Sequence, residues 1–325
     1  MQTQLCQLLL AKDFDNARLL LQSHLQSAEI FDPRSDREWA PIADSIAAEF
    51  SKSSGLNATI PFWEGLLEFF LHVLEPTWGH CHKGHIYFRL GILYVRRDLS
   101  TARQHLTKAR EEDMLLKRAI ASSEEQAIAL AQQSSSYVAL ALLERIKDDD
   151  FASSPEKEAF LDHLFGPSFD AAIQGQDVDP ALLQEALRAL VPAQGIQDCI
   201  ALHRELSTAS QLGLPYAVVM LTGTVLEAVL LAILYYDKAV SCTAAGKDIL
   251  RVELGTLFHE AITHGIFPNS NIQAAAQLVH LFRNRIHPGN ESRQTHRLTP
   301  RVAITLKTMF ELSLVLWKNE ATQPC

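Results

Sequence analysis

Apolar residues recur at intervals of three and four along most of the chain, which is the spacing of one face of an α-helix. The pattern is clear in four places: Leu5, Leu8 and Leu9; Ala17, Leu20, Leu21 and Leu25; Ile86, Leu90, Leu93 and Tyr94; Val302, Leu306, Phe310 and Leu314. Proline and glycine interrupt it at Pro33, Pro76, Gly166-Pro167, Pro192 and Pro288-Gly289. No Asn-Gly or Asp-Gly turn lies between alternating apolar runs. The sequence therefore predicts an all-α fold.

Two segments of the first half share one order of residue types. Residues 12–18 and 97–103 both read basic, Asp, apolar, two polar residues, Ala, Arg. The small side chains of Gly91 and Ala102 would let two neighbouring helices approach closely. The second copy is preceded by Leu90-Gly91-x-x-Tyr94 and followed by Leu106 and Ala109. That order, from Leu90 to Ala109, resembles a tetratricopeptide repeat, which implies an irregular array of helical hairpins over residues 1–150. The order does not recur at the family's period of about 34 residues, so a plain helical bundle stays open as the alternative.

Polar and proline-rich stretches predict the limits of the domains. The acidic run 148–150 and Ser153-Ser154-Pro155 indicate a solvated break, and a further helix between Asp179-Pro180 and Pro192 is expected. We expect an N-terminal helical domain over 1–150, a helical connector over 151–192 and a second domain over 193–325.

The segment 214–236 is long and apolar enough to cross a membrane. It carries Glu227 near its middle, and a central acid costs about 2.5–3.5 kcal/mol on insertion scales. We expect a buried core helix and no membrane association, with a membrane span as the alternative.

The overall composition is that of a cytoplasmic protein. The five cysteines are scattered and none forms a Cys-x-x-Cys pair, which favours reduced thiols over a disulfide framework. The formal net charge of −9 argues against general coating of nucleic acid.

One stretch departs from this acidic balance. Between Leu281 and Lys307 six basic residues stand against one acid, Glu291; they are Arg283, Arg285, Arg293, Arg297, Arg301 and Lys307. Such a basic island could contact RNA phosphates. Alternatively, its arginines bridge acidic helices elsewhere in the chain.

The same stretch contains an Arg/His pair at helical spacing. Residues 271–287 predict a helix that ends before Pro288. Arg283 and His287 are four residues apart and so share one face. A guanidinium beside a proton donor suits phosphodiester cleavage, because one stabilises the anionic transition state and the other moves a proton.

The order of these features resembles a domain of the HEPN superfamily. The matching elements are an apolar helix with Gly223-Thr224-Val225-Leu226-Glu227-Ala228-Val229-Leu230, a helix from Leu254-Gly255-Thr256-Leu257 to Ala261, Arg283-Asn284-Arg285-Ile286-His287-Pro288-Gly289, and a last helix from about Pro300 to Trp317. The resemblance covers roughly residues 196–319.

This resemblance implies a helical bundle that forms a homodimer and cleaves RNA without a metal or cofactor, as in toxin–antitoxin or antiviral systems. It implies that His287 acts on the attacking 2′-hydroxyl or the leaving group. Arg283 would hold the phosphate, Asn284 would orient the pair, and Glu227 would be a polar partner of Arg283. Arg285 would support the site, and Arg293, Arg297 and Arg301 would bind RNA. The N-terminal array would sense a trigger or hold a protein partner.

A second function stays open beside this one. In HEPN nucleases the spacing from Arg to His is usually wider than the three residues found here, and catalytically silent members serve for binding or dimerisation. The alternative is therefore a non-catalytic interaction module in which Arg283 and His287 are structural.

The histidine-rich segment His80-Cys81-His82, with His85, contains residue types that bind zinc. A closed zinc site needs four converging ligands, which this short segment would supply only with strain. We expect a structural turn, with a metal site as the alternative.

Overall fold

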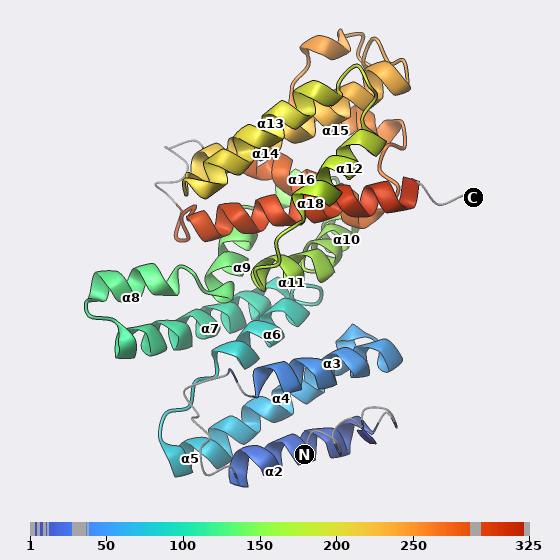
Figure 1. Ribbon diagram of the computed structural model, residues 1–325. Helices are drawn as coiled ribbons and strands as arrows, with labels where there is room; N and C mark the ends of the chain where they lie inside the picture. The colour runs from blue at the N-terminus through green and yellow to red at the C-terminus, as the bar shows by residue number, and fades with distance from the viewer. Residues whose placement is uncertain are drawn as a thin grey trace. The chain divides into compact units, whose positions relative to one another are not determined.

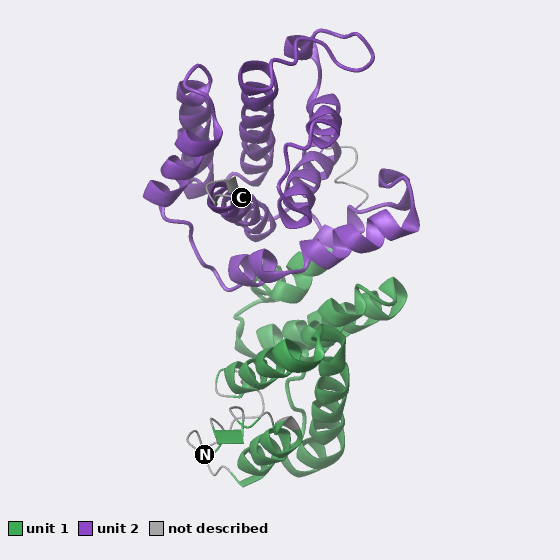
Figure 2. Cartoon of the chain, turned by 90° about the vertical axis from the view of Figure 1, so that its right-hand side faces the viewer, with its two compact units in different colours: residues 1–140 green, residues 141–325 purple. Residues whose placement is uncertain are grey.

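The computed structural model describes residues 13–27, 37, 39–286 and 294–321, together with positions 4, 7, 8 and 11. Over these residues the structure is helical, and its β contact is one isolated bridge between Cys242 and Asp248. The predicted all-α class is confirmed. The chain divides into two compact units, residues 1–140 and 141–325 (Figure 2).

The first unit is a succession of helices and short turns (Figure 1). Two of its helices start at side-chain caps, because Asp98 and Ser123 each accept a backbone N–H two or three residues ahead. Its elements are α2 (Phe14–Ser27), α3 (Ala40–Ser54), the 3-10 turn η1 (Leu56–Thr59), α4 (Ile60–Phe69), the π-helical turn η2 (Phe70–Leu74), α5 (Glu75–Trp78), α6 (Gly84–Tyr94), α7 (Leu99–Ile120), α8 (Glu124–Ala131) and the start of α9 (Ser135–Glu144).

Close packing joins α6 to α7. A Cβ on Gly91 would lie 2.6 Å from Leu106 Cγ, so only glycine allows this approach. Ala102 and Leu106 are fully buried. The contact expected from the small residues is present, and the assignment to tetratricopeptide repeats stays a prediction.

The second unit contains the rest of α9 and the remaining helices. Its elements are η3 (Asp148–Asp150), α10 (Ser154–Leu164), α11 (Pro167–Ile173), α12 (Pro180–Leu190), α13 (Ile196–Gln211), α14 (Pro215–Ala232), the π-helical turn η4 (Ile233–Asp237), η5 (Ile249–Arg251), α15 (Leu254–Thr263), α16 (Ser270–Arg285) and α18 (Pro300–Ala321). Helix α18 is its centre, since α11, α12, α14 and α16 all pack against it.

This division differs from the boundaries expected at residues 150 and 192. Helix α10 packs against α16, and α11 and α12 pack against α18. Phe169 and Leu187 are fully buried there. Residues 151–192 therefore supply part of the core of the second unit. The sequence signals for a connector were exposed polar turns between helices that belong to one body.

The apolar segment at 215–237 is a continuous helix formed by α14 and η4. Its most apolar 18-residue stretch has a mean hydropathy of 2.3, and 61% of that stretch is buried inside the protein. By length and composition alone it could cross a membrane. Its burial against α13, α16 and α18 is that of a core helix.

Candidate functional site

The last turn of α16 places Arg283 against α14. Arg283 Nη1 donates to Glu227 Oε2, and the two side chains are 23% and 28% exposed. A Cβ on Gly223 would lie 2.5 Å from Arg283 Cδ. Because Gly223 has no side chain, the stem of Arg283 can cross α14 and reach Glu227 one turn further on. The expected contact between Glu227 and Arg283 is therefore present.

Asn284 lies beside His280, one turn earlier on α16. Its Nδ2 is 3.3 Å from His280 Nε2, and the imidazole stacks on Phe258 with the ring planes 8° apart. Burial, followed by the positive charge of Arg283, lowers the pKa of His280. The ring is therefore neutral near pH 7. Sequence reasoning did not select His280 as a site residue. The signal that could have identified it is its position on the helix, since it lies three residues before Arg283 and four before Asn284 and so shares their face.

Most of the basic island is bound inside the second unit. Arg285 donates to Asp150 and to the carbonyl of Arg145, and Arg301 donates to the carbonyl of Ile173. Burial lowers the pKa of Arg301. Lys307 Nζ is 2.7 Å from the buried carboxylate of Glu311. Of the expected RNA-binding residues, Arg297 is exposed, whereas Arg301 is committed to α11.

His287 and Arg293 lie outside the described residues, so the expected pairing of His287 with Arg283 is a prediction only. Thr295 and His296, which follow these residues in the chain, are held by the end of α9 and by Arg145. Glu144 accepts hydrogen bonds from the backbone N–H of Thr295 at 2.7 Å and of His296 at 2.9 Å. Burial raises the pKa of Glu144, but these bonds and the one from the His296 ring outweigh it, so that the pKa is lowered. Arg145 donates to the carbonyl of His296 at 3.0 Å.

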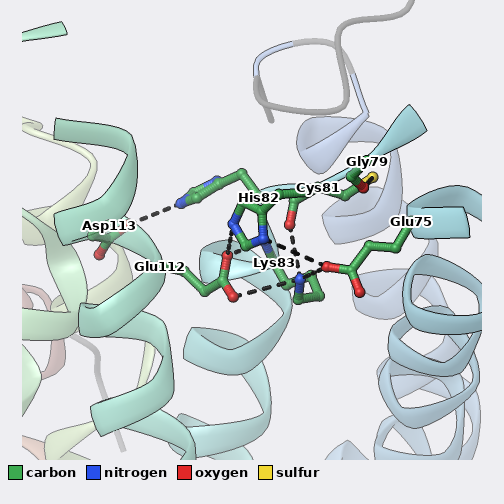
Figure 3. A network of polar contacts seen from close by, with 8 residues as sticks. Glu75, Gly79, Cys81, His82, Lys83, Glu112 and Asp113 are labelled. Atoms are coloured by element: carbon green, nitrogen blue, oxygen red, sulfur yellow. Dashed lines mark hydrogen bonds and ion pairs between the residues drawn. The ribbon is translucent and has the colours of Figure 1, made fainter. Parts of the chain in front are cut away.

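The histidine-rich segment forms a charge network in the first unit (Figure 3). Lys83 is buried and its ammonium pairs with Glu75, Glu112 and the carbonyl of Cys81. His80 Nε2 lies 3.0 Å from Glu112 Oε2. A lysine ammonium thus sits between the two glutamates.

The other histidines of this segment turn to different carboxylates. His82 Nε2 lies 3.2 Å from Asp113, which also accepts a hydrogen bond from Ser136 at 2.6 Å. His85 lies 3.1 Å from Asp44. Within the described ranges, no group of three or more His, Cys, Asp or Glu side chains is arranged to hold a metal ion. The histidines of this segment therefore contact different carboxylates and do not converge on one point. Their contacts link this segment and the start of α6 to α5, α7 and α3, and Asp113 extends the network to α9.

Comparisons with protein-family models, with curated proteins and with solved structures find no match to this chain. The resemblance to the HEPN superfamily is thus a hypothesis based on residues 223–230, 254–261 and 283–289.

Proposed function

We propose that the second unit is a HEPN-like, non-catalytic interaction module that joins two copies of this chain. The observation that carries this proposal is the internal commitment of the basic side chains. Arg283, Arg285 and Arg301 each bind an acceptor of the same unit. A guanidinium already paired with a carboxylate must lose that partner before it binds a phosphate.

The exposed face of α14 supports self-association. Tyr216 and Met220, one turn apart, are 45% and 43% exposed, and Leu212 just before this helix is 67% exposed. The same face continues to Glu227 and its partner Arg283. In a two-fold dimer this face of α14 meets the same face of the second copy, which covers its apolar surface. Glu227 of one copy can then face Arg283 of the other.

Oligomeric state tests this proposal. We expect the full chain to be a dimer by size-exclusion chromatography with light scattering, and Met220→Glu to be a folded monomer. Leu250→Glu is the matched control, because Leu250 is at least as exposed as Met220, at 51% against 43%, but lies in η5. A monomeric wild type at tens of micromolar, or dimeric Met220→Glu, would reject the α14 interface.

A second candidate function is a metal-independent endoribonuclease. It is favoured by the position of Arg283, which keeps part of its surface exposed at the end of α16, four residues before His287. In this function His287 moves the proton, Arg283 stabilises the phosphate charge, and Asn284 and the neutral His280 orient the pair.

Cleavage of RNA by the purified chain separates the two functions. The nuclease would leave 2′,3′-cyclic phosphate ends and resist chelators, and His287→Ala would abolish cutting while the protein stays folded. We expect no cleavage, because the interaction module uses Arg283 structurally. RNA cleavage that His287→Ala removes would establish the nuclease instead.

Two further assignments belong to this proposal. The helical array of the first unit would hold a protein partner, and the scattered cysteines, which suggest reduced thiols, favour a cytoplasmic location.

A further inference from the structure

The imidazole of His280 lies at the contact between α15 and α16 in the second unit. Gly255 and Phe258 are three residues apart and so share one face of α15. A Cβ on Gly255 would lie 2.9 Å from His280 Cε1, and the Phe258 ring stacks on the imidazole with centroids 6.1 Å apart and planes at 8°. One titratable side chain therefore touches two positions of α15.

The contact continues through a row of aromatic rings. Phe258 packs against Phe267, which follows the end of α15, with ring centroids 5.5 Å apart. Phe267 packs in turn against Trp317 of α18, also at 5.5 Å. Phe258 and Trp317 are buried. The position of the imidazole is thus linked to the packing of α15 and of the turn that follows it.

The surroundings of the ring favour its neutral form. Asn284 Nδ2 lies 3.3 Å from His280 Nε2 and donates to this nitrogen only while it keeps its lone pair. An imidazolium has donors only, so this hydrogen bond cannot form with the amide in its present orientation. Burial and then the charge of Arg283 lower the pKa of His280. Among the smaller effects, Asp150 raises this pKa and Arg285 lowers it.

The charged groups around this ring have partners of their own. Asp150, the acid whose charge acts on the ring, is bound by Arg285. The helices α10, α14, α15 and α18 pack against α16. They carry Lys157 paired with Asp148, Glu227 paired with Arg283, Glu260 bound to the N–H of Ala244, and Lys307 paired with Glu311. A proton on His280 therefore competes with existing pairs for a carboxylate.

We propose that His280 is a proton-sensitive joint of the second unit. When the imidazole takes up a proton, it leaves Gly255 and Phe258 for water, and α15 detaches from α16 while the helices packed on α18 stay in place. Because the pKa of this histidine is lowered, the stability that the contact contributes is complete above the unfolded value of about 6.5 and is lost as the pH falls below it. The joint acts within one copy of the chain, so it depends neither on the dimer nor on RNA cleavage.

Hydrogen–deuterium exchange of the full chain tests the proposal on the two sides of the histidine range, at about pH 7.5 and about pH 5. Protection factors are compared, because they correct for the pH dependence of exchange itself. Local opening of one helix lowers the protection of that helix alone. We expect the protection of α15 to fall in acid by up to about tenfold for each pH unit, the limit for one proton. The protection of α12 should not change.

Substitutions of single histidines identify the group that takes up the proton. His280→Gln and His280→Phe both remove it, so the protection of α15 should be equal at the two pH values, whatever its level. His259→Gln is the matched control, because His259 is an exposed histidine of the same helix. His264→Gln is a second control, since this histidine lies 3.8 Å from Glu260 at the end of α15.

Both control variants should keep the response of the wild type. The proposal would be overturned by a wild type without a response in α15, or by a response that spreads equally to α12. It would also be overturned by a response that survives in His280→Gln or that either control variant removes.

Discussion

Asp44 shows most clearly how a single residue is tuned by its neighbours. It lies in α3 and contacts His85 at 3.1 Å and Arg89 at 2.8 and 2.9 Å. Burial raises the pKa of Asp44, but hydrogen bonds and positive charge from His85 and Arg89 outweigh it and lower the pKa to about 2. The carboxylate form therefore stabilises the folded state.

The pH dependence follows from the direction of this shift. A lowered acid pKa contributes stability that is complete above the unfolded value of about 4 and is lost as the pH falls to about 2. We expect Asp44→Asn to lower the free energy of unfolding at pH 6, and the difference from wild type to shrink between pH 4 and 2. Urea titrations followed by tryptophan fluorescence measure this. A difference that stays constant over that window would contradict it.

Gly223 is a second residue whose surroundings decide the effect of a substitution. Alanine is favoured over glycine in a helix by about 1 kcal/mol. At position 223, however, the new methyl group would overlap the buried stem of Arg283 and push it away from Glu227. We expect Gly223→Ala to destabilise the chain by about 1–2 kcal/mol, measured by chemical unfolding.

Gly65 of α4 is the matched control for that substitution. A Cβ there would meet only the tip of Arg18, with Nη1 at 2.8 Å, and the end of a long side chain can move aside. Gly65→Ala should therefore be neutral or stabilising. If both substitutions changed the free energy of unfolding equally, the fit of Arg283 on α14 would not contribute to stability.

At the scale of elements, local patterns predicted helices well but not their long-range partners. The three- and four-residue periodicity gives α2, α6 and α18, where most apolar residues at that spacing are buried. The contact of Glu227 with Arg283 was expected only from the resemblance to the HEPN superfamily. By contrast, the acceptor of Arg285 lies 135 residues away at Asp150, and no local signal specifies it.

The domain limits expected at 150 and 192 differ from the division of the structure at 140/141 for the same reason. Polar turns at 148–155 and Pro192 resemble linkers, whereas the buried faces of α10, α11 and α12 show their role only once α16 and α18 are in place. The basic island has the same limit, because the sequence reveals the charge of Arg301 but not its carbonyl acceptor in α11.

Truncation tests this organisation of the second unit. We expect residues 141–325 to melt cooperatively by circular dichroism. Residues 193–325 should lose the cooperative melt, because they lack the three helices that cover α16 and α18 and lack Glu144 and Asp150. The domain limits expected from the sequence imply instead that 193–325 folds alone. A melt of 193–325 at the temperature of 141–325 would restore that prediction and make α10–α12 dispensable.

At the scale of the whole molecule, the described part of the chain has to accommodate a helix that is apolar and long enough for a membrane. In water this requires burial, and the structure covers it with α13, α16 and α18. Its acid, Glu227, has a partner on α16. In a bilayer the same segment would lose this ion pair and place a carboxylate in hydrocarbon.

Fractionation of the whole chain distinguishes these two environments. We expect the protein to stay in the aqueous supernatant after high-speed centrifugation without detergent, because the apolar face of α14 is used inside the second unit. Glu227→Leu supplies the sharper comparison. It removes the charge that opposes insertion, at a cost to folding since Arg283 then loses its partner. If α14 is a core helix, this variant should be less stable than wild type. It should then either remain in the supernatant or form aggregates that contain no lipid. If α14 enters membranes, the variant should move to the lipid fraction more completely than wild type, and that result would overturn the packing of the second unit around α14.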